Sequence, residues 1–157
     1  MTRIIQKVLR LPLHQLCANL FQCQAVVVAD SRVVVFDSVA ITQSIWIKGK
    51  QFSIQNLTLE PKLSKVWSDG AVASFRLSPQ DYHRYHSPVE GTLVWWKQIP
   101  GEYYNVDAIA LRSNVDILTS NARSCACIST KAFGQVLFVA IGATGVGTVK
   151  FVFNTSN

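Results

Sequence analysis

Short apolar runs separated by turn-forming residues occupy most of the chain after residue 22. Val-rich runs at residues 25–29 and 32–36 are divided by the polar pair Asp30-Ser31. Such short β-rich runs between turns are typical of antiparallel sheets. We therefore expect a mainly β, α+β domain built as an antiparallel, partly open sheet assembly, with a bend or bulge at Asp30.

The same pattern predicts more strands downstream. A hairpin is expected from residues 44–48 and 51–54 around Gly49, and another around Phe133-Gly134. Residues 60–70 are polar and contain Pro61, so we expect a loop there. Strands are expected at residues 71–77, 92–99, 103–111, 124–130, 135–143 and 148–153.

An N-terminal helix is predicted at about residues 3–22. Arg3, Lys7 and Arg10 recur at helical spacing beside apolar residues, and residues 1–29 contain no acidic side chain. We interpret residues 1–22 as a basic amphipathic segment that associates with membranes or directs targeting, with an ordinary surface helix as the alternative. Residues 23–157 form the domain itself.

A second, shorter helical turn is predicted to carry two histidines. Residues 78–81, SPQD, have the residue types of a helix start, and Pro88 should end the turn. His83 and His86 then lie on one face, three residues apart. A histidine pair beside a carboxylate is compatible with metal binding, acid–base catalysis or a structural corner. Because the sequence offers no further ligands at firm spacing, we expect no metal.

Composition and charge limit the function further. The chain has 157 residues, 49% hydrophobic, enough for one core. Its longest apolar run, residues 136–143, is far shorter than the roughly 18 residues of a membrane-spanning helix. The net charge of +6 favours an anionic membrane surface, while the scattering of the cations disfavours nucleic acid. Cys125 and Cys127 should share one face of a strand as buried thiols rather than as a metal pair.

Four motifs in order resemble one enzyme family. Residues 75–91, FRLSPQDYHRYHSPVEG, look like the signature of the phosphatidylserine decarboxylases, pyruvoyl-dependent enzymes that make phosphatidylethanolamine. The resemblance covers about residues 25–153. The other three motifs are ADS at 29–31, IKG at 47–49 followed by FSI at 52–54, and FVAIGAT at 138–144 followed by VGT at 146–148.

The resemblance implies a carboxy-lyase made as a proenzyme. Such a proenzyme cuts itself before the serine of a Gly-Ser-Thr type motif, and that serine becomes the pyruvoyl group of a small α chain. By motif position, His86 removes the serine proton and Asp30 orients the His86 ring. His83 meets the substrate carboxylate and returns a proton after CO2 leaves. The expected substrate pocket contains Tyr82, Tyr85, Ile141 and Ala143.

The sequence departs from the family pattern after Thr148, where no Gly-Ser-Thr motif follows. We therefore expect a β-chain-like portion, truncated at its C-terminus, that carries no pyruvoyl group, is inactive alone and works with a pyruvoyl-bearing α chain. A non-catalytic relic that binds lipid or regulates a full-length homologue is the alternative. A free amino acid such as tryptophan is a less favoured substrate, because residues 81–91 match the phospholipid enzymes closely.

The expected partners follow from the same resemblance. They are phosphatidylserine, an anionic membrane surface and the α chain, with a homo-oligomer as a further expectation. The expected location is peripheral, at the mitochondrial inner membrane or an endomembrane.

Overall fold

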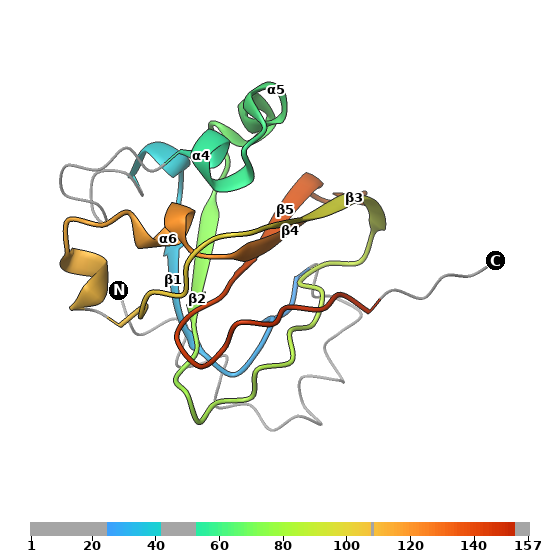
Figure 1. Ribbon diagram of the computed structural model, residues 1–157. Helices are drawn as coiled ribbons and strands as arrows, with labels where there is room; N and C mark the ends of the chain where they lie inside the picture. Colours follow the sequence, from blue (N-terminus) through green and yellow to red (C-terminus); the bar gives the residue numbers. More distant parts are fainter. Residues whose placement is uncertain (1–24, 42–52, 108, 153–157) are drawn as a thin grey trace.

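The computed structural model describes residues 25–41, 53–107 and 109–152, and the structural statements below concern these residues (Figure 1). The helix predicted at 3–22 and most of the hairpin predicted at 44–54 lie outside them. Within the described residues the chain forms antiparallel sheets with a few short helices, so the mainly β, α+β prediction is confirmed. No helix among the described residues is both long enough and apolar enough to cross a membrane.

Within the described ranges, five strands form two sheets. β1 pairs with β2 in a two-stranded sheet, and β3, β4 and β5 form a three-stranded sheet in that order. All these pairings are antiparallel, as predicted. The strands are β1 (Arg32–Phe36), β2 (Val72–Arg76), β3 (Thr92–Ile99), β4 (Arg123–Thr130) and β5 (Gly134–Ile141).

The hairpin of β4 and β5 forms where it was predicted. Gly134 adopts a φ of 68°, in the left-handed region that glycine tolerates without cost. The Phe133 N–H donates to the Thr130 hydroxyl at 2.8 Å and closes the turn. The turn residues therefore set the register, which pairs Thr130 with Gly134.

Short helices occupy the connection between β1 and β2 and the connection between β3 and β4. The Ser53 hydroxyl accepts from the Asn56 N–H at 3.0 Å and caps α4, so Ile54 begins a helix rather than ending the predicted strand. The loop prediction for residues 60–70 is wrong, because Pro61 starts a helix, where its fixed φ is favourable. Among the described residues, the helices between these strands include α4 (Ile54–Thr58), α5 (Pro61–Ser64) and α6 (Ile117–Ser120), with 3₁₀ turns η1 (Lys65–Trp67) and η2 (Ala110–Arg112).

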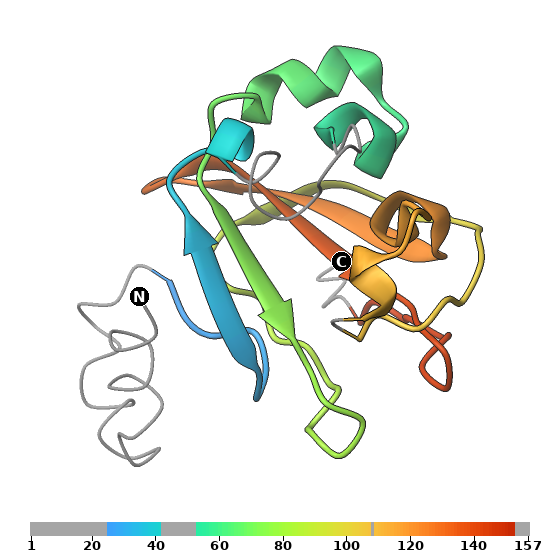
Figure 2. The same ribbon diagram turned by 90° about the vertical axis from the view of Figure 1, so that its left-hand side faces the viewer.

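The core lies between these helices and one face of the three-stranded sheet (Figure 2). The Trp67 ring meets Trp95 edge to face, with ring centroids 6.3 Å apart, and its Nε1–H donates to the Gln135 carbonyl at 2.9 Å. This bond joins η1 to β5 across 68 residues of sequence. The buried cluster consists of Val39, Ile54, Leu57, Trp67 and Cys127.

The two described cysteines are buried thiols, as predicted. Cys125 and Cys127 are both 0% exposed and occupy alternate positions of β4. Burial raises the pKa of both thiols above the ordinary value, although Arg123 and Lys97 act in the opposite direction on Cys125. The thiols are therefore protonated at neutral pH and act as small apolar side chains of the sheet.

The segment at residues 103–111 is not a strand, contrary to prediction. Near its start, the buried Asn121 side chain pairs with the backbone of Tyr104: the Asn121 Oδ1 accepts from the Tyr104 N–H at 3.0 Å. The Asn121 Nδ2 donates to the carbonyls of Tyr104 and Gly142, both at 2.8 Å. Asn121 thus satisfies the backbone of Tyr104 without a strand partner. Further along, the Ala110 N–H donates to the Asp107 carboxylate at 2.7 Å and the chain forms η2 instead of a strand.

The strand predicted at residues 148–153 is also absent from residues 148–152. This segment crosses β3 instead. The Gln98 Nε2 donates to the Val149 carbonyl at 2.9 Å, and the Trp96 ring lies 6.0 Å from that of Phe151. Side-chain contacts therefore hold the segment against the sheet in place of backbone pairing.

Candidate functional site

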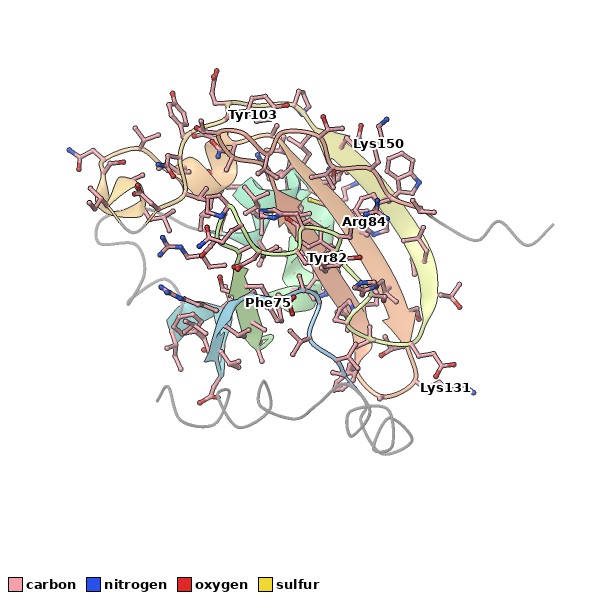
Figure 3. All side chains as sticks on the ribbon, turned by 90° about the horizontal axis from the view of Figure 1, so that it is seen from below. Phe75, Tyr82, Arg84, Tyr103, Lys131 and Lys150 are labelled. Carbon is pink, nitrogen blue, oxygen red and sulfur yellow. The ribbon has the colours of Figure 1, made fainter. Side chains whose placement is uncertain are left out.

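The face of the three-stranded sheet opposite the core carries the candidate site. Trp96, Ala126 and Phe138 pair in register across β3, β4 and β5. Alternation along the strands turns these side chains away from the helices. At one end of the row Trp96 contacts Phe151, and at the other Phe138 contacts Tyr85, with ring centroids 6.0 Å apart. Figure 3 shows the loop that bears Tyr82 and Arg84, and the segment that bears Lys150, in front of this face.

Two backbone hydrogen bonds bring the histidine loop beside residues 25–31. The Val26 N–H donates to the Pro88 carbonyl at 2.8 Å, and the His86 N–H donates to the Val28 carbonyl at 2.8 Å. These bonds continue the antiparallel course of β1 and β2 beyond the paired strands. Segments that are far apart in the sequence therefore meet at His86.

The two sides of this ribbon have unequal lengths. Between the His86–Val28 bond and the first pair of β1 and β2, residues 29–31 lie on one side and residues 77–85 on the other. The longer side must leave the ribbon as a loop, and it carries His83. Asp30 lies in the bend on the shorter side and is exposed. The fold thus brings the predicted acidic residue and both predicted histidines to one end of the ribbon.

The helix predicted after Ser78 does not form, and only one hydrogen-bonded turn is present, at residues 78–81. The Asp81 N–H donates to the Ser78 carbonyl at 2.9 Å, but residues 82–87 are not helical. In a helix the His86 N–H would donate to a carbonyl one turn earlier in the same segment. Here it donates to the Val28 carbonyl instead. The prediction that one helical face carries His83 and His86 is therefore wrong, because pairing with a neighbouring segment overrides the local helix signal.

His83 is half-buried, and one side of its ring is held by the loop itself. Its Nδ1 lies 2.6 Å from the Asp81 carbonyl oxygen. The Asp81 carboxylate in turn accepts from the Ser78 N–H through Oδ2 at 2.7 Å. Hydrogen bonding by Asp81 therefore fixes the loop at this point.

His86 is exposed, and its environment differs from that of His83. Its ring stacks on Tyr82, with centroids 5.9 Å apart and planes 10° apart. Among the described residues, no hydrogen bond or ion pair joins the side chains of Asp30 and His86. The backbone bond from the His86 N–H to the Val28 carbonyl places His86 beside the segment that bears Asp30, two residues further along.

The structure does not bring Tyr85, Ile141 and Ala143, three of the predicted pocket residues, to one place. Tyr85 is half-buried against Phe138, and burial raises the pKa of its hydroxyl. Ile141 packs against the core cluster on the helix side of the sheet, so the structure does not bring it to the histidine loop. Ala143 lies in a tight turn, where its N–H donates to the Val146 carbonyl at 3.0 Å.

Sequence reasoning missed Phe138 and the carbonyl of Asp81. Phe138 is the first residue of the quoted late motif, and the alternation of β5 could have placed it on the face opposite Ile141. The role of the Asp81 carbonyl has no sequence signal, because any residue has that group. Across the described residues, no group of three or more His, Cys, Asp or Glu side chains is arranged to hold a metal ion.

This arrangement suits proton transfer. One imidazole is half-buried and anchored through a single nitrogen, and the other is exposed beside a bend that bears a carboxylate. Imidazoles titrate close to neutral pH and can both accept and donate protons there. The neighbouring aromatic surface of Tyr85 and Phe138 would reduce solvation of a bound group.

Comparison with known proteins identifies relatives of the chain. The sequence model of the family described as phosphatidylserine decarboxylase matches residues 17–157. The chain is 47% identical over 125 residues to phosphatidylserine decarboxylase proenzyme 2 of Oryza sativa subsp. japonica, which covers 79% of this chain and 20% of the rice protein. It is 40% identical over 123 residues to proenzyme 2 of Saccharomyces cerevisiae, covering 77% of this chain and 11% of the yeast protein.

A bacterial relative shows the same relation. The chain is 33% identical over 129 residues to the phosphatidylserine decarboxylase proenzyme of Fusobacterium nucleatum, covering 82% of this chain and 43% of that protein. The chain thus spans less than half the length of each of these three relatives.

Proposed function

Because this chain belongs to the phosphatidylserine decarboxylase family, we propose that it is a β-chain-like part of a phosphatidylserine decarboxylase. Its reaction would convert phosphatidylserine to phosphatidylethanolamine and CO2, together with an α chain that bears a pyruvoyl group. The observation that carries this proposal is the loop with His83 and His86, held beside the bend at Asp30 and over the outer face of the sheet.

His86 and Asp30 would act in proenzyme self-cleavage. In this role the His86 imidazole takes the proton of the attacking serine hydroxyl, and the Asp30 carboxylate stabilises the charged ring. The backbone bond between His86 and Val28 supports this pairing, because it fixes the base beside the segment that bears the acid. Both side chains are exposed, so the serine segment of the proenzyme could reach them.

His83 would act in substrate turnover. The pyruvoyl group supplies the electron-withdrawing carbonyl that takes up the electron pair left by CO2. The half-buried His83 and the aromatic pair of Tyr85 and Phe138 fit a site beside such a group on the α chain. His83 would hold the proton that replaces the carboxylate, and the aromatic surface would exclude water around it.

A chimeric proenzyme tests these two roles. The chain is continued by a segment that carries the family's Gly-Ser-Thr motif, and cleavage is followed by mass spectrometry. We expect self-cleavage and formation of phosphatidylethanolamine. His86→Ala should slow cleavage by about 10²–10⁴-fold, because general acid–base catalysis contributes that much. Asp30→Asn should slow it as well, with the fold unchanged, because Asp30 is exposed.

His83→Ala provides the matched comparison in the same chimera. It should cleave within a few-fold of the parent rate but form no phosphatidylethanolamine. Cleavage at the parent rate in His86→Ala would refute the role of His86. A chimera that folds but neither cleaves nor decarboxylates would favour the non-catalytic, lipid-binding alternative.

We also propose that the chain works at an anionic membrane surface, where a phospholipid substrate is found. The net charge of +6 and the exposed side chains of Arg84, Lys131 and Lys150 support this. In sedimentation assays the chain should bind vesicles that contain phosphatidylserine more strongly than vesicles of phosphatidylcholine, and salt should weaken binding. Equal binding to both vesicles would contradict electrostatic attachment.

A further inference from the structure

Asp81 uses three of its polar groups within the histidine loop. Its N–H donates to the Ser78 carbonyl at 2.9 Å, and its carboxylate accepts from the Ser78 N–H at 2.7 Å. Both bonds join Ser78 to Asp81, so together they close the turn between these two residues. The remaining backbone group, the Asp81 carbonyl, lies 2.6 Å from the His83 Nδ1.

The contact between His83 and Asp81 determines where the His83 proton lies. A carbonyl oxygen can only accept a hydrogen bond, so the nitrogen that faces it must carry hydrogen. In the neutral ring this leaves Nε2 without hydrogen and free to take a proton. The charged ring keeps the same bond, because both of its nitrogens carry hydrogen. The proton that comes and goes is therefore the one on Nε2.

We propose that Asp81 is a positioning residue that holds His83 as the Nδ1–H tautomer and presents its Nε2 for proton transfer. The importance of this tautomer for turnover rests on the proposed function, but the tautomer itself does not. The Asp81 carboxylate acts indirectly, because it fixes the turn from which the Asp81 carbonyl points at the ring. A turn without that carboxylate would leave the carbonyl free to move away.

His86 offers an internal comparison on the same loop. Its ring stacks on Tyr82 and, among the described residues, makes no hydrogen bond to a backbone carbonyl. Nothing in this environment selects one nitrogen, so neutral His86 should favour the Nε2–H form preferred by free histidine. The two rings should therefore differ in tautomer although they lie three residues apart.

Nuclear magnetic resonance of the full chain, labelled with ¹⁵N, tests the proposal without any enzyme assay. The sequence contains three histidines, His14, His83 and His86, so single substitutions assign every imidazole signal. Spectra are recorded at about pH 9, well above the ordinary histidine pKa of about 6.5. For His83 we expect a protonated Nδ1 and an unprotonated Nε2.

Two substitutions at Asp81 separate its carboxylate from its carbonyl. Asp81→Asn keeps a side-chain oxygen for the Ser78 N–H and should preserve the Nδ1–H form. Asp81→Ala removes that acceptor, so the His83 signals should move towards the Nε2–H form. Ser87→Ala is the matched control, because the Ser87 hydroxyl donates to the Val89 carbonyl in the same loop and does not contact His83.

The outcomes distinguish this proposal from the proposed function. An Nε2–H form of His83 in the parent chain would overturn the assignment, and that measurement needs no substituted protein. An unchanged tautomer in a folded Asp81→Ala variant would overturn the positioning role. Failure of the chimeric proenzyme to cleave or turn over would leave both tautomer measurements as they stand.

Discussion

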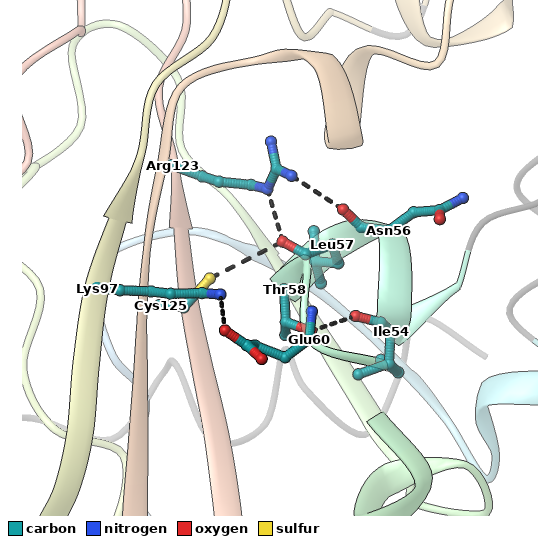
Figure 4. A network of polar contacts seen from close by, with 8 residues as sticks. All are labelled: Ile54, Asn56, Leu57, Thr58, Glu60, Lys97, Arg123 and Cys125. Carbon is teal, nitrogen blue, oxygen red and sulfur yellow. Dashed lines mark hydrogen bonds and ion pairs between the residues drawn. The ribbon is translucent and has the colours of Figure 1, made fainter. Parts of the chain in front are cut away.

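Replacing Arg123 with methionine should lower the free energy of unfolding by about 3–5 kcal/mol. Four backbone carbonyls lose the Arg123 donor, two of these bonds are buried and two are partly buried, and a polar group left buried without a partner costs roughly 1–3 kcal/mol. The Arg123 side chain is only 3% exposed. Its Nε donates to the Leu57 carbonyl at 2.6 Å and its Nη2 to the Asn56 carbonyl at 2.9 Å (Figure 4). Its Nη1 donates to the carbonyls of Thr119 and Asn121, at 2.7 and 2.9 Å.

The position of these carbonyls explains the size of the effect. They lie near the ends of α4 and α6, where the last carbonyls of a helix have no partner inside it. Each helix is too short to be stable alone, so both depend on contacts with the sheet. Burial lowers the pKa of Arg123, with Cys125 and Asp116 acting in the opposite direction, but a guanidinium remains charged. One cation on β4 thus fixes two helices.

Urea denaturation of matched variants checks this expectation. Lys97→Met is the control from the same region, because Lys97 and Glu60 form a partly exposed ion pair at 2.9 Å. Its loss should cost no more than about 1 kcal/mol. Arg123→Lys should fall between the two, since an ammonium group keeps the charge but cannot reach both helix ends. A loss below 1 kcal/mol in Arg123→Met would contradict this account.

The sheet could be predicted from the sequence because its signals are local. Residues 92–99 were predicted as a strand and form β3, and the turn at Phe133-Gly134 correctly placed the hairpin of β4 and β5. Alternation and turn residues act within a few positions of one another, so one sequence suffices to read them.

The errors fall where distant parts of the chain decide the structure. Trp67 binds the Gln135 carbonyl and anchors a helical segment in residues 60–70 that looked like a loop. The Asn121 side chain, and not a neighbouring strand, pairs with the backbone of Tyr104 in a segment that the sequence predicted as a strand. A single asparagine or tryptophan in a sequence does not reveal a partner that is 17 or 68 residues away.

The predictions for the candidate site were also correct in one part and wrong in another. The family resemblance assigned Asp30, His83 and His86 to one site, and the structure brings their segments together at one end of the β1–β2 ribbon. The helical geometry expected for the two histidines depended on the local signal at residues 78–81. Backbone pairing of His86 with a segment more than fifty residues earlier replaced that geometry.

Gly91→Ala is expected to cost about 2–3 kcal/mol, as overpacking in a well-packed region does. A Cβ at Gly91 would lie 2.4 Å from the Ser129 carbonyl oxygen and 2.7 Å from the Ile128 Cγ2. Backbone cannot move aside cheaply there, because β4 is paired on both sides, with β3 and with β5. The glycine that ends the histidine motif is therefore required by close packing of the start of β3 against β4.

Gly134→Ala separates this packing effect from the general cost of replacing glycine. A Cβ at Gly134 would meet nothing within 4 Å, but its φ of 68° carries a cost of roughly 1–2 kcal/mol for other residues. Urea denaturation should therefore rank Gly91→Ala as the more damaging variant. Because Gly91 joins the histidine loop to β3, the same variant should also shift the NMR signals of Tyr85 and His83, which Gly134→Ala should leave in place. Equal losses of stability with unchanged loop signals would show that β3 can move away from β4 without disturbing the loop.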